Sequence, residues 1–177
     1  MFEKMKRISK DEEGINIICE GMGFDPKVAY ELTKMMLEQY SRSVVAGKIL
    51  SSMTKASDQE KNKRQMRKDF LEIMKLPIEE SKEMQRKLLW QVSEYEWLEA
   101  PKNYVLEGMQ DYGNSGPIYV SIINNRYMTK DKKTMVVLAN ELGFSVASLE
   151  NKKREAIKLF GIMMYRYAAK LEEEDTE

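Results

Sequence analysis

Apolar residues recur every three or four positions along most of the chain, which is the spacing of one face of an α-helix. In residues 8–22 this face contains four side chains: Ile15, Ile18, Cys19 and Met22. Asp25 and Pro26 follow, and an Asp directly before a Pro is typical of an N-cap and the first position of a helix. The pattern therefore predicts one short helix and the start of a second.

A longer apolar stripe extends from Pro26 to about Met53. We expect this second helix to bury the face that includes Leu32 and Met35. The helix that contains Trp90 is its expected packing partner.

Residues 61–68 carry five cations and no acid: Lys61, Lys63, Arg64, Arg67 and Lys68. Such a run can contact phosphates or an acidic partner. It can also be the solvated face of a helix whose Met66, Phe70 and Ile73 pack inward. The second interpretation is the favoured one.

Prolines at three positions begin further segments: Pro77, Pro101 and Pro117. After the first of these, Trp90 and Trp97 share one helical face, and we expect both rings in the core. Residues 117–128 are rich in β-branched side chains but also fit a helical face, and we predict a helix there. The acidic residues 171–177 are expected to be a frayed end.

Composition supports a helical protein. The 177 residues include only nine Gly and four Pro, and Met, Lys, Glu and Leu are abundant. We expect an all-α protein of six to eight helices, a helical bundle with a C-terminal helix-turn-helix. We assign residues 1–76 to an N-terminal region for partner binding or dimerisation. Residues 77–177 form a second helical region, with the helix-turn-helix at about 132–160.

Several kinds of chemistry are excluded by the residues that are missing. The chain has no His and one Cys, so a Cys/His metal site or a His-dependent nucleophile cannot be assembled. We expect neither enzymatic activity nor a cofactor or metal. No apolar run approaches the roughly 18 residues of a membrane span, and no signal peptide is recognised. With a single cysteine, these features indicate a cytoplasmic protein without a membrane partner.

The stretch "ELGFSVASLENKKREA", residues 141–156, has the chemistry of a tight turn between two helices. Thr134 is a candidate N-cap for the first helix, and Gly143 suits the left-handed conformation that ends one. Ser145 is a candidate N-cap for the second helix. A small Ala139 at the crossing and Leu149 packing back on the first helix complete the pattern.

This pattern, with Arg154, Glu155 and Ala156 behind it, resembles region four of bacterial sigma factors. It also resembles transcription regulators of the ArpU and RinA type from phages and bacteria. The resemblance covers roughly residues 101–160. It implies a transcription regulator that binds double-stranded DNA, with RNA polymerase and a second copy of the chain as further candidate partners.

Local charge agrees with a DNA-binding role. The chain has 29 basic and 29 acidic residues, whereas residues 124–160 contain eight basic and four acidic ones, a local net charge of +4. We expect the second helix to lie in the major groove. Its candidate base-reading residues are Val146, Ala147, Ser148, Asn151 and Lys152. The candidate phosphate contacts are Lys132, Lys133, Lys153, Arg154 and Lys158. The alternative is a helical protein–protein adaptor or structural protein whose C-terminal hairpin serves only packing.

Overall fold

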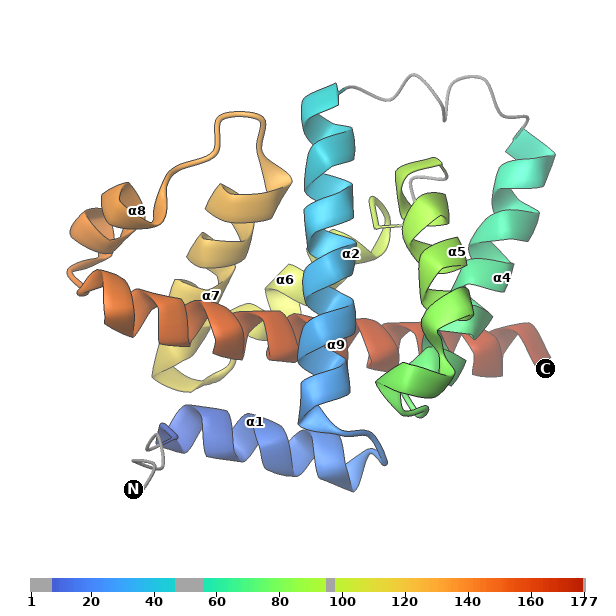
Figure 1. Cartoon of the computed structure of the whole chain (residues 1–177), viewed down its shortest axis with the longest axis horizontal. Coiled ribbons are helices and arrows are strands. Elements are labelled where there is room, and N and C mark those ends of the chain that lie inside the picture. The colour runs from blue at the N-terminus through green and yellow to red at the C-terminus, as the bar shows by residue number, and fades with distance from the viewer. Residues whose placement is uncertain (1–7, 47–55, 95–97, 177) are drawn as a thin grey trace.

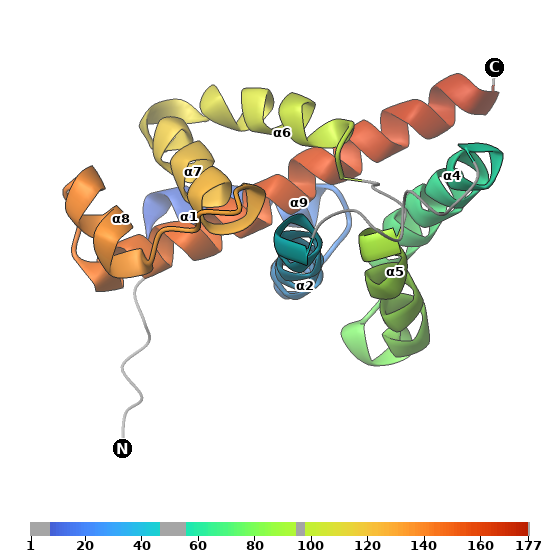
Figure 2. The same ribbon diagram turned by 90° about the horizontal axis from the view of Figure 1, so that it is seen from above.

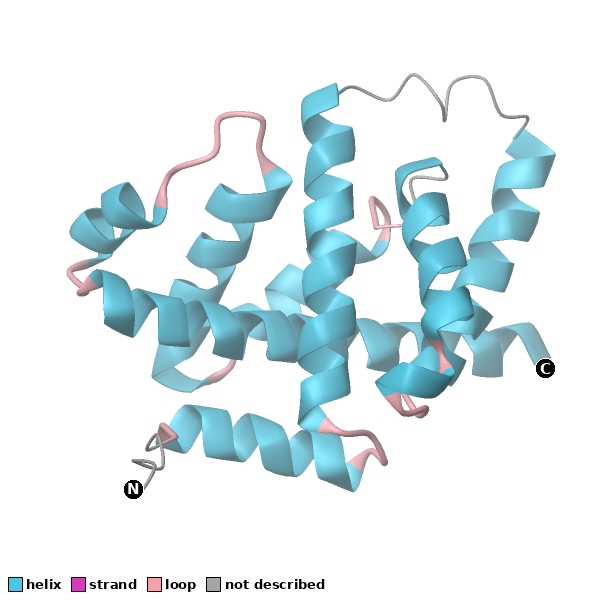
Figure 3. Ribbon diagram, viewed as in Figure 1, coloured by secondary structure: helices cyan, strands magenta, loops and turns pink. Residues whose placement is uncertain are grey.

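The computed structural model of the chain describes residues 8–46, 56–94 and 98–176, and every regular element in these ranges is helical (Figure 3). The α-helices are α1 (Lys10–Gly21), α2 (Pro26–Ala46), α4 (Ala56–Ile73), α5 (Lys82–Glu94), α6 (Pro101–Gln110), α7 (Gly116–Ile123), α8 (Met135–Leu142) and α9 (Val146–Thr176). Three shorter turns of helix lie between them: η1 (Ile78–Glu80), η2 (Gly113–Ser115) and the π-helical η3 (Asn124–Met128). The predicted all-α class is confirmed for the described residues.

α9 is the long rod around which the other helices are arranged (Figure 1). It contacts α1, α2, α4, α6, α7 and α8. Viewed from above, α6 and α7 lie on one side of α9, and α2 and α5 lie on the other (Figure 2). α8 packs at the N-terminal end of the rod, and α4 lies toward its C-terminal end. The main hydrophobic core therefore draws residues from both 1–76 and 77–177.

The crossing of α2 over α9 requires a glycine. A Cβ atom at Gly161 would lie 2.2 Å from Oγ1 of Thr33 and 3.4 Å from the carbonyl oxygen of Ala29. The hydroxyl of Thr33 is buried and has no hydrogen-bond partner among the described atoms. Gly161 thus lets the backbone of α9 lie directly against the Thr33 side chain of α2. A glycine in the middle of a helix lowers its stability relative to alanine.

Several predictions about α2 are confirmed. α2 begins at Pro26, and the backbone N–H of Lys27 donates to Oδ1 of Asp25 at 2.8 Å, as expected for a cap. Leu32 is buried, Met35 is half-buried, and α2 packs against α5 as predicted. The described part of α2 extends to Ala46, and the predicted continuation to about residue 53 lies outside the described ranges.

The prediction for the tryptophan pair is wrong at Trp90, whose side chain is 60% exposed. The neighbouring Leu88 and Val92 are buried instead, so the apolar face of α5 that meets the core is rotated away from the indole. Trp97 lies outside the described residues.

The acidic end of the chain is also not frayed, because α9 continues to Thr176. The buried guanidinium of Arg67 on α4 donates from Nε to Glu172 at 2.6 Å and also pairs with Asp175. Met66, Phe70 and Ile73 are fully buried as predicted. The cationic run of residues 61–68 therefore belongs to a packed helix, and two of its charges, Arg64 and Arg67, pair with acids in the C-terminal turns of α9.

No helix within the described part of the chain combines the length and apolar character needed to cross a membrane.

Gly161→Ala should lower the free energy of unfolding by about 1–3 kcal/mol, because the added methyl group overlaps Thr33. Guanidinium denaturation measures this change. Gly21→Ala is the control, since a Cβ there meets no atom within 4 Å. Adding Thr33→Ala to Gly161→Ala should recover part of the loss, because it removes the overlapping oxygen. Equal stability of the two glycine variants would contradict the close crossing.

Candidate functional site

α8 and α9 meet at a tight corner whose ends are capped as the sequence predicts. Oγ1 of Thr134 accepts a hydrogen bond from the backbone N–H of Val137 at 3.3 Å. Gly143 ends α8 with φ of 75°, a left-handed conformation that an L side chain rarely adopts. Oγ of Ser145 accepts from the backbone N–H of Ser148 at 3.1 Å and caps α9. The three-residue turn is thus defined by its own hydrogen bonds.

The corner rests on a small core that is separate from the main one. Its buried members are Ile122 of α7, Leu138 and Ala139 of α8, and Leu149 of α9. Partly buried side chains close its edge: Ile118, Met135, Leu142 and Phe144. Because α7 supplies one side of this core, the corner is a three-helix unit at one end of the molecule (Figure 1).

The first turn of α9 is open to solvent. Val146, Ala147 and Ser148 are exposed, and Val146 retains 41% of its accessible surface. Asn151 is half-buried and faces α1 and α2, since it lines two small hollows that also include Glu12 and Tyr30. The exposed first turn of α9 thus contains three of the predicted base-reading residues, and Asn151 lies at its edge.

Three predicted phosphate contacts are exposed or pair with exposed acids. Lys132 is exposed, in the loop before α8. Nζ of Lys133 pairs with Glu141 at 2.7 Å, and Nζ of Lys153 pairs with Glu150 at 2.9 Å. Ion pairs with such exposed acids are weak. A phosphate can therefore displace them at little cost.

The remaining predicted contacts are paired with carboxylates of the same chain. Lys152 donates to Oδ2 of Asp11 at 3.0 Å and to Oε2 of Glu155 at 3.1 Å. Arg154 and Lys158 both donate to Glu12. In the folded protein the carboxylates of α1 occupy donors of all three cations, so a DNA contact by these residues requires those bonds to be released.

Glu12 is at the centre of this charge cluster. Arg154 donates two hydrogen bonds to its carboxylate, from Nε at 2.9 Å and from Nη2 at 3.0 Å. Nζ of Lys158 donates a third at 2.9 Å. Lys158 also donates to Oδ1 of Asn16 at 3.0 Å. The hydrogen bond from Arg154, reinforced by Lys158, outweighs the effect of burial and lowers the pKa of Glu12 to about 2.

Glu155 connects α9 to α1 and α7. Its side chain is 1% exposed, and it accepts hydrogen bonds from Oγ of Ser9 at 2.5 Å, Oη of Tyr119 at 2.7 Å and Nζ of Lys152. Burial, together with the bond to Glu155, raises the pKa of Tyr119, so this phenol remains a neutral donor. Ser115 donates to Asp11 at 2.6 Å and closes the network.

The cluster changes the charge available at the corner. Its three cations are balanced by Asp11, Glu12 and Glu155. Without Lys152, Arg154, Lys158 and Glu155, residues 124–160 keep five basic and three acidic residues, a net charge of +2. The local excess of +4 read from the sequence therefore overstates the positive charge that a polyanion meets.

Sequence reasoning missed the acidic partners of α9. Asp11 and Glu12 were visible as acids in a first helical turn behind the cap Ser9, which is a common helix start. Nothing in the spacing indicates that this turn packs against residues about 140 positions later. Only the contact between α1 and α9 brings them together.

Two features of the described residues bear on metal binding and on thiol chemistry. No group of three or more Cys, Asp or Glu side chains there is arranged to hold a metal ion. Burial raises the pKa of Cys19 to about 11, so the thiol stays protonated and unreactive.

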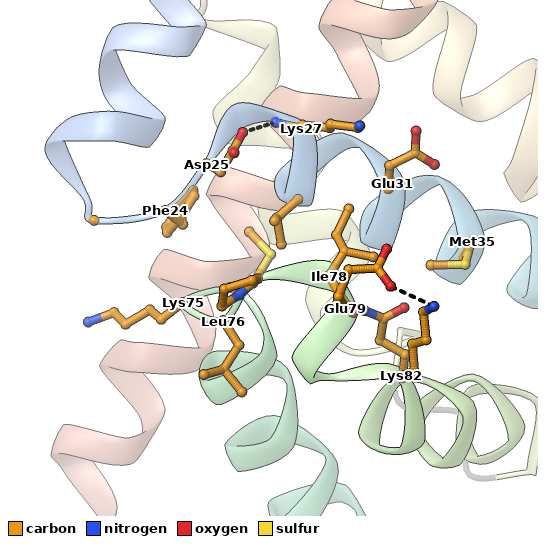
Figure 4. Close-up of a pocket in the computed structure, with 15 residues that line it drawn as sticks. Phe24, Asp25, Lys27, Glu31, Met35, Lys75, Leu76, Ile78, Glu79 and Lys82 are labelled. Carbon is orange, nitrogen blue, oxygen red and sulfur yellow. Dashed lines mark hydrogen bonds and ion pairs between the residues drawn. The ribbon is translucent and has the colours of Figure 1, made fainter.

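A larger hollow of about 670 Å³ lies between the turn before α2 and the turn that joins α4 to α5 (Figure 4). Its lining is largely apolar: Phe24, Val28, Met35, Met74, Leu76 and Ile78. Its rim carries equal numbers of acids and cations: Asp25, Glu31 and Glu79 with Lys27, Lys75 and Lys82. Glu79 and Lys82 pair with each other at 2.6 Å. The rim therefore presents no net charge to select a ligand.

No protein-family model matches the chain, and neither the curated protein sequences nor the solved structures gave a significant match.

The charge cluster predicts an acid dependence of stability. The pKa of Glu12 is about 2 when folded and near its ordinary value of 4.5 when unfolded. Its contribution is thus complete above about pH 5 and is lost as the pH falls toward 2. The difference is on the order of 3 kcal/mol. Denaturant titrations between these pH values should show this loss in the wild type and not in Glu12→Gln.

Glu13→Gln is the matched control, because Glu13 is the exposed neighbour on the same helix. It should retain the acid dependence of the wild type. If the free energy of unfolding falls equally with pH in Glu12→Gln and Glu13→Gln, Glu12 is not the group responsible for the acid dependence.

Proposed function

We propose that the corner of α8 and α9 is a helix-turn-helix that binds double-stranded DNA, and that the protein regulates transcription through it. The observation that carries the proposal is the exposed first turn of α9, which follows a capped three-residue turn and stands on its own small core. A helix held in this way can enter the major groove with its N-terminal residues against base edges.

The exposed residues suit distinct parts of such a complex. The methyl groups of Val146 and Ala147 can contact thymine, and the hydroxyl of Ser148 can donate or accept at a base edge. Asn151, at the edge of this surface, can reach adenine after releasing a 3.4 Å contact from Arg154. Each role uses a side chain near the N-terminus of α9.

Phosphates have a separate set of ligands. Lys132, Lys133 and Lys153 surround the corner, and the N-terminal turns of α8 and α9 add backbone N–H groups with a favourable dipole. The net charge of +2 supports binding of modest strength, in the ordinary range of roughly 10⁻⁴–10⁻⁶ M for non-specific DNA at physiological salt. RNA polymerase and a second copy of the chain are proposed further partners. Such a role places the protein in the cytoplasm, where bacterial and phage DNA is read.

The proposal predicts salt-dependent binding of duplex DNA, measured by fluorescence anisotropy with a short labelled duplex. Lys132→Ala combined with Lys153→Ala should weaken binding to every sequence and flatten the salt dependence by about two units of slope. Lys61→Ala combined with Lys68→Ala is the matched control. It removes the same charge from exposed positions on α4 and should leave binding nearly unchanged.

Base reading has its own test, in which binding sites are selected from a random duplex library. Ser148→Ala and Asn151→Ala should each lose about 1–3 kcal/mol on the selected site and keep the salt slope of the wild type. Failure of the wild type to bind any duplex below about 100 μM at low salt would reject the DNA-binding proposal, since that is weaker than ordinary non-specific binding.

Protein docking at the same corner is the second candidate, because three valines are exposed there. Val136 and Val137 on α8 and Val146 on α9 retain 57%, 45% and 41% of their surface. Exposed apolar side chains gathered in one place are typical of protein interfaces. The partner that can be tested directly is a second copy of the chain.

Sedimentation analysis over a range of protein concentrations tests this alternative. If two copies associate through the valines, Val137→Asp should weaken self-association about tenfold or more. Ile17→Asp, at a 63% exposed position on α1, is the control and should have no such effect. A monomer at all concentrations, combined with DNA binding, would leave DNA as the ligand of the corner.

A further inference from the structure

We propose that α1 is an intramolecular acidic cover for a cationic stripe on α9, defined as Lys152, Arg154 and Lys158, and that polyanions bind more tightly when α1 is displaced. The inference rests on the proposed function, because the polyanion in question is DNA bound at the corner of α8 and α9. It adds a regulatory contact within the same chain.

The covering contacts resemble those that phosphates would make. Arg154 holds the carboxylate of Glu12 in a two-bond fork, which is also how a guanidinium holds a phosphate. Lys158 donates to the same carboxylate, and Lys152 donates to Asp11. Two carboxylates from one short helix thus occupy donors on all three cations of the stripe.

The stripe is well placed to extend a DNA contact. It begins two turns after Ser145, so it continues along the same helix from the residues proposed to meet base edges. Displacing α1 would return the three cations, together with Glu155, to this surface and raise the net charge of residues 124–160 from +2 to +4. Because each phosphate contact releases counterions, this change would raise both affinity and salt sensitivity.

α1 has fewer buried residues than α9, the helix against which it packs. Its buried residues are Glu12, Ile15 and Cys19, so only two apolar side chains anchor it beside the ionic contacts. The middle of α9, in contrast, is buried, and α9 contacts six other helices. Elements with few buried apolar contacts open at the lowest free-energy cost. Release of α1 is the local opening that would expose the stripe, and it requires the ionic contacts of Glu12 to be broken.

The test compares two double variants that each remove two negative charges from α1. Asp11→Asn with Glu12→Gln acts inside the cluster, and Glu13→Gln with Glu20→Gln acts at exposed positions. The probe is a short labelled duplex titrated by anisotropy at several salt concentrations. The cluster variant should bind about tenfold more tightly at low salt, with a slope steeper by about one to two units. The control variant should stay close to the wild type.

Equal effects of the two double variants would overturn the cover and leave the proposed function intact, since general charge would then explain the gain. If the cluster variant does not fold, as judged by its melting curve, Asp11→Asn against Glu13→Gln makes the same comparison. Asp11 suits this purpose because its side chain is 42% exposed at the rim of the cluster.

A second measurement separates failure of the cover from failure of the proposed function. If neither the wild type nor the cluster variant binds duplex DNA, the DNA proposal is wrong. Amide hydrogen exchange with inorganic polyphosphate then tests the cover by itself. Faster exchange in residues 10–21, without a change in residues 101–110, supports displacement of α1 by a polyanion. Unchanged exchange in residues 10–21 overturns it.

Discussion

The middle of α9 is surrounded by protein, and every residue from 155 to 162 is buried. A helix enclosed in this way must be apolar or must carry its polar groups to partners, because an unpaired charge in the interior is strongly unfavourable. Two residues of this segment, Glu155 and Lys158, are charged. Their partners are supplied by α1 and α7, and the arrangement of those helices around α9 follows from this requirement.

Close packing adds a second constraint at the same segment. Gly161 allows α2 to pack closely against α9. α2 in turn packs against α5. At the far end, Arg67 holds the last turns of α9 to α4 through Glu172 and Asp175. The long helix is thus tied along its length, whereas its first turn, before Leu149, projects from the small core of the corner.

This arrangement determines which charges are available for binding. The cations of α9 divide by the acid with which each one pairs, and α1 makes the division. Lys153 pairs with the exposed Glu150 of its own helix, while its neighbours Lys152 and Arg154 pair with carboxylates of α1. Consecutive positions on a helix point in different directions, so a run of cations in sequence is not one surface. A switch that moves α1 would change this division without altering the corner.

The sequence by itself determined the helical class, most helix starts and the corner of α8 and α9. These features depend on local chemistry: the cap at Thr134, the left-handed Gly143 and the cap at Ser145 act within a few residues of one another. The burial of Leu32, Met66 and Phe70 could also be predicted, because helical spacing marks an apolar face.

Only the tertiary structure decided which face of α5 is buried, and hence the exposure of Trp90. It also decided that the acidic end of α9 pairs with Arg67, and that Glu12 pairs with Arg154 and Lys158. These outcomes depend on contacts between residues more than a hundred positions apart. Periodicity shows that a helix has a charged or apolar face, but the neighbour that the face meets is set by packing of the whole chain.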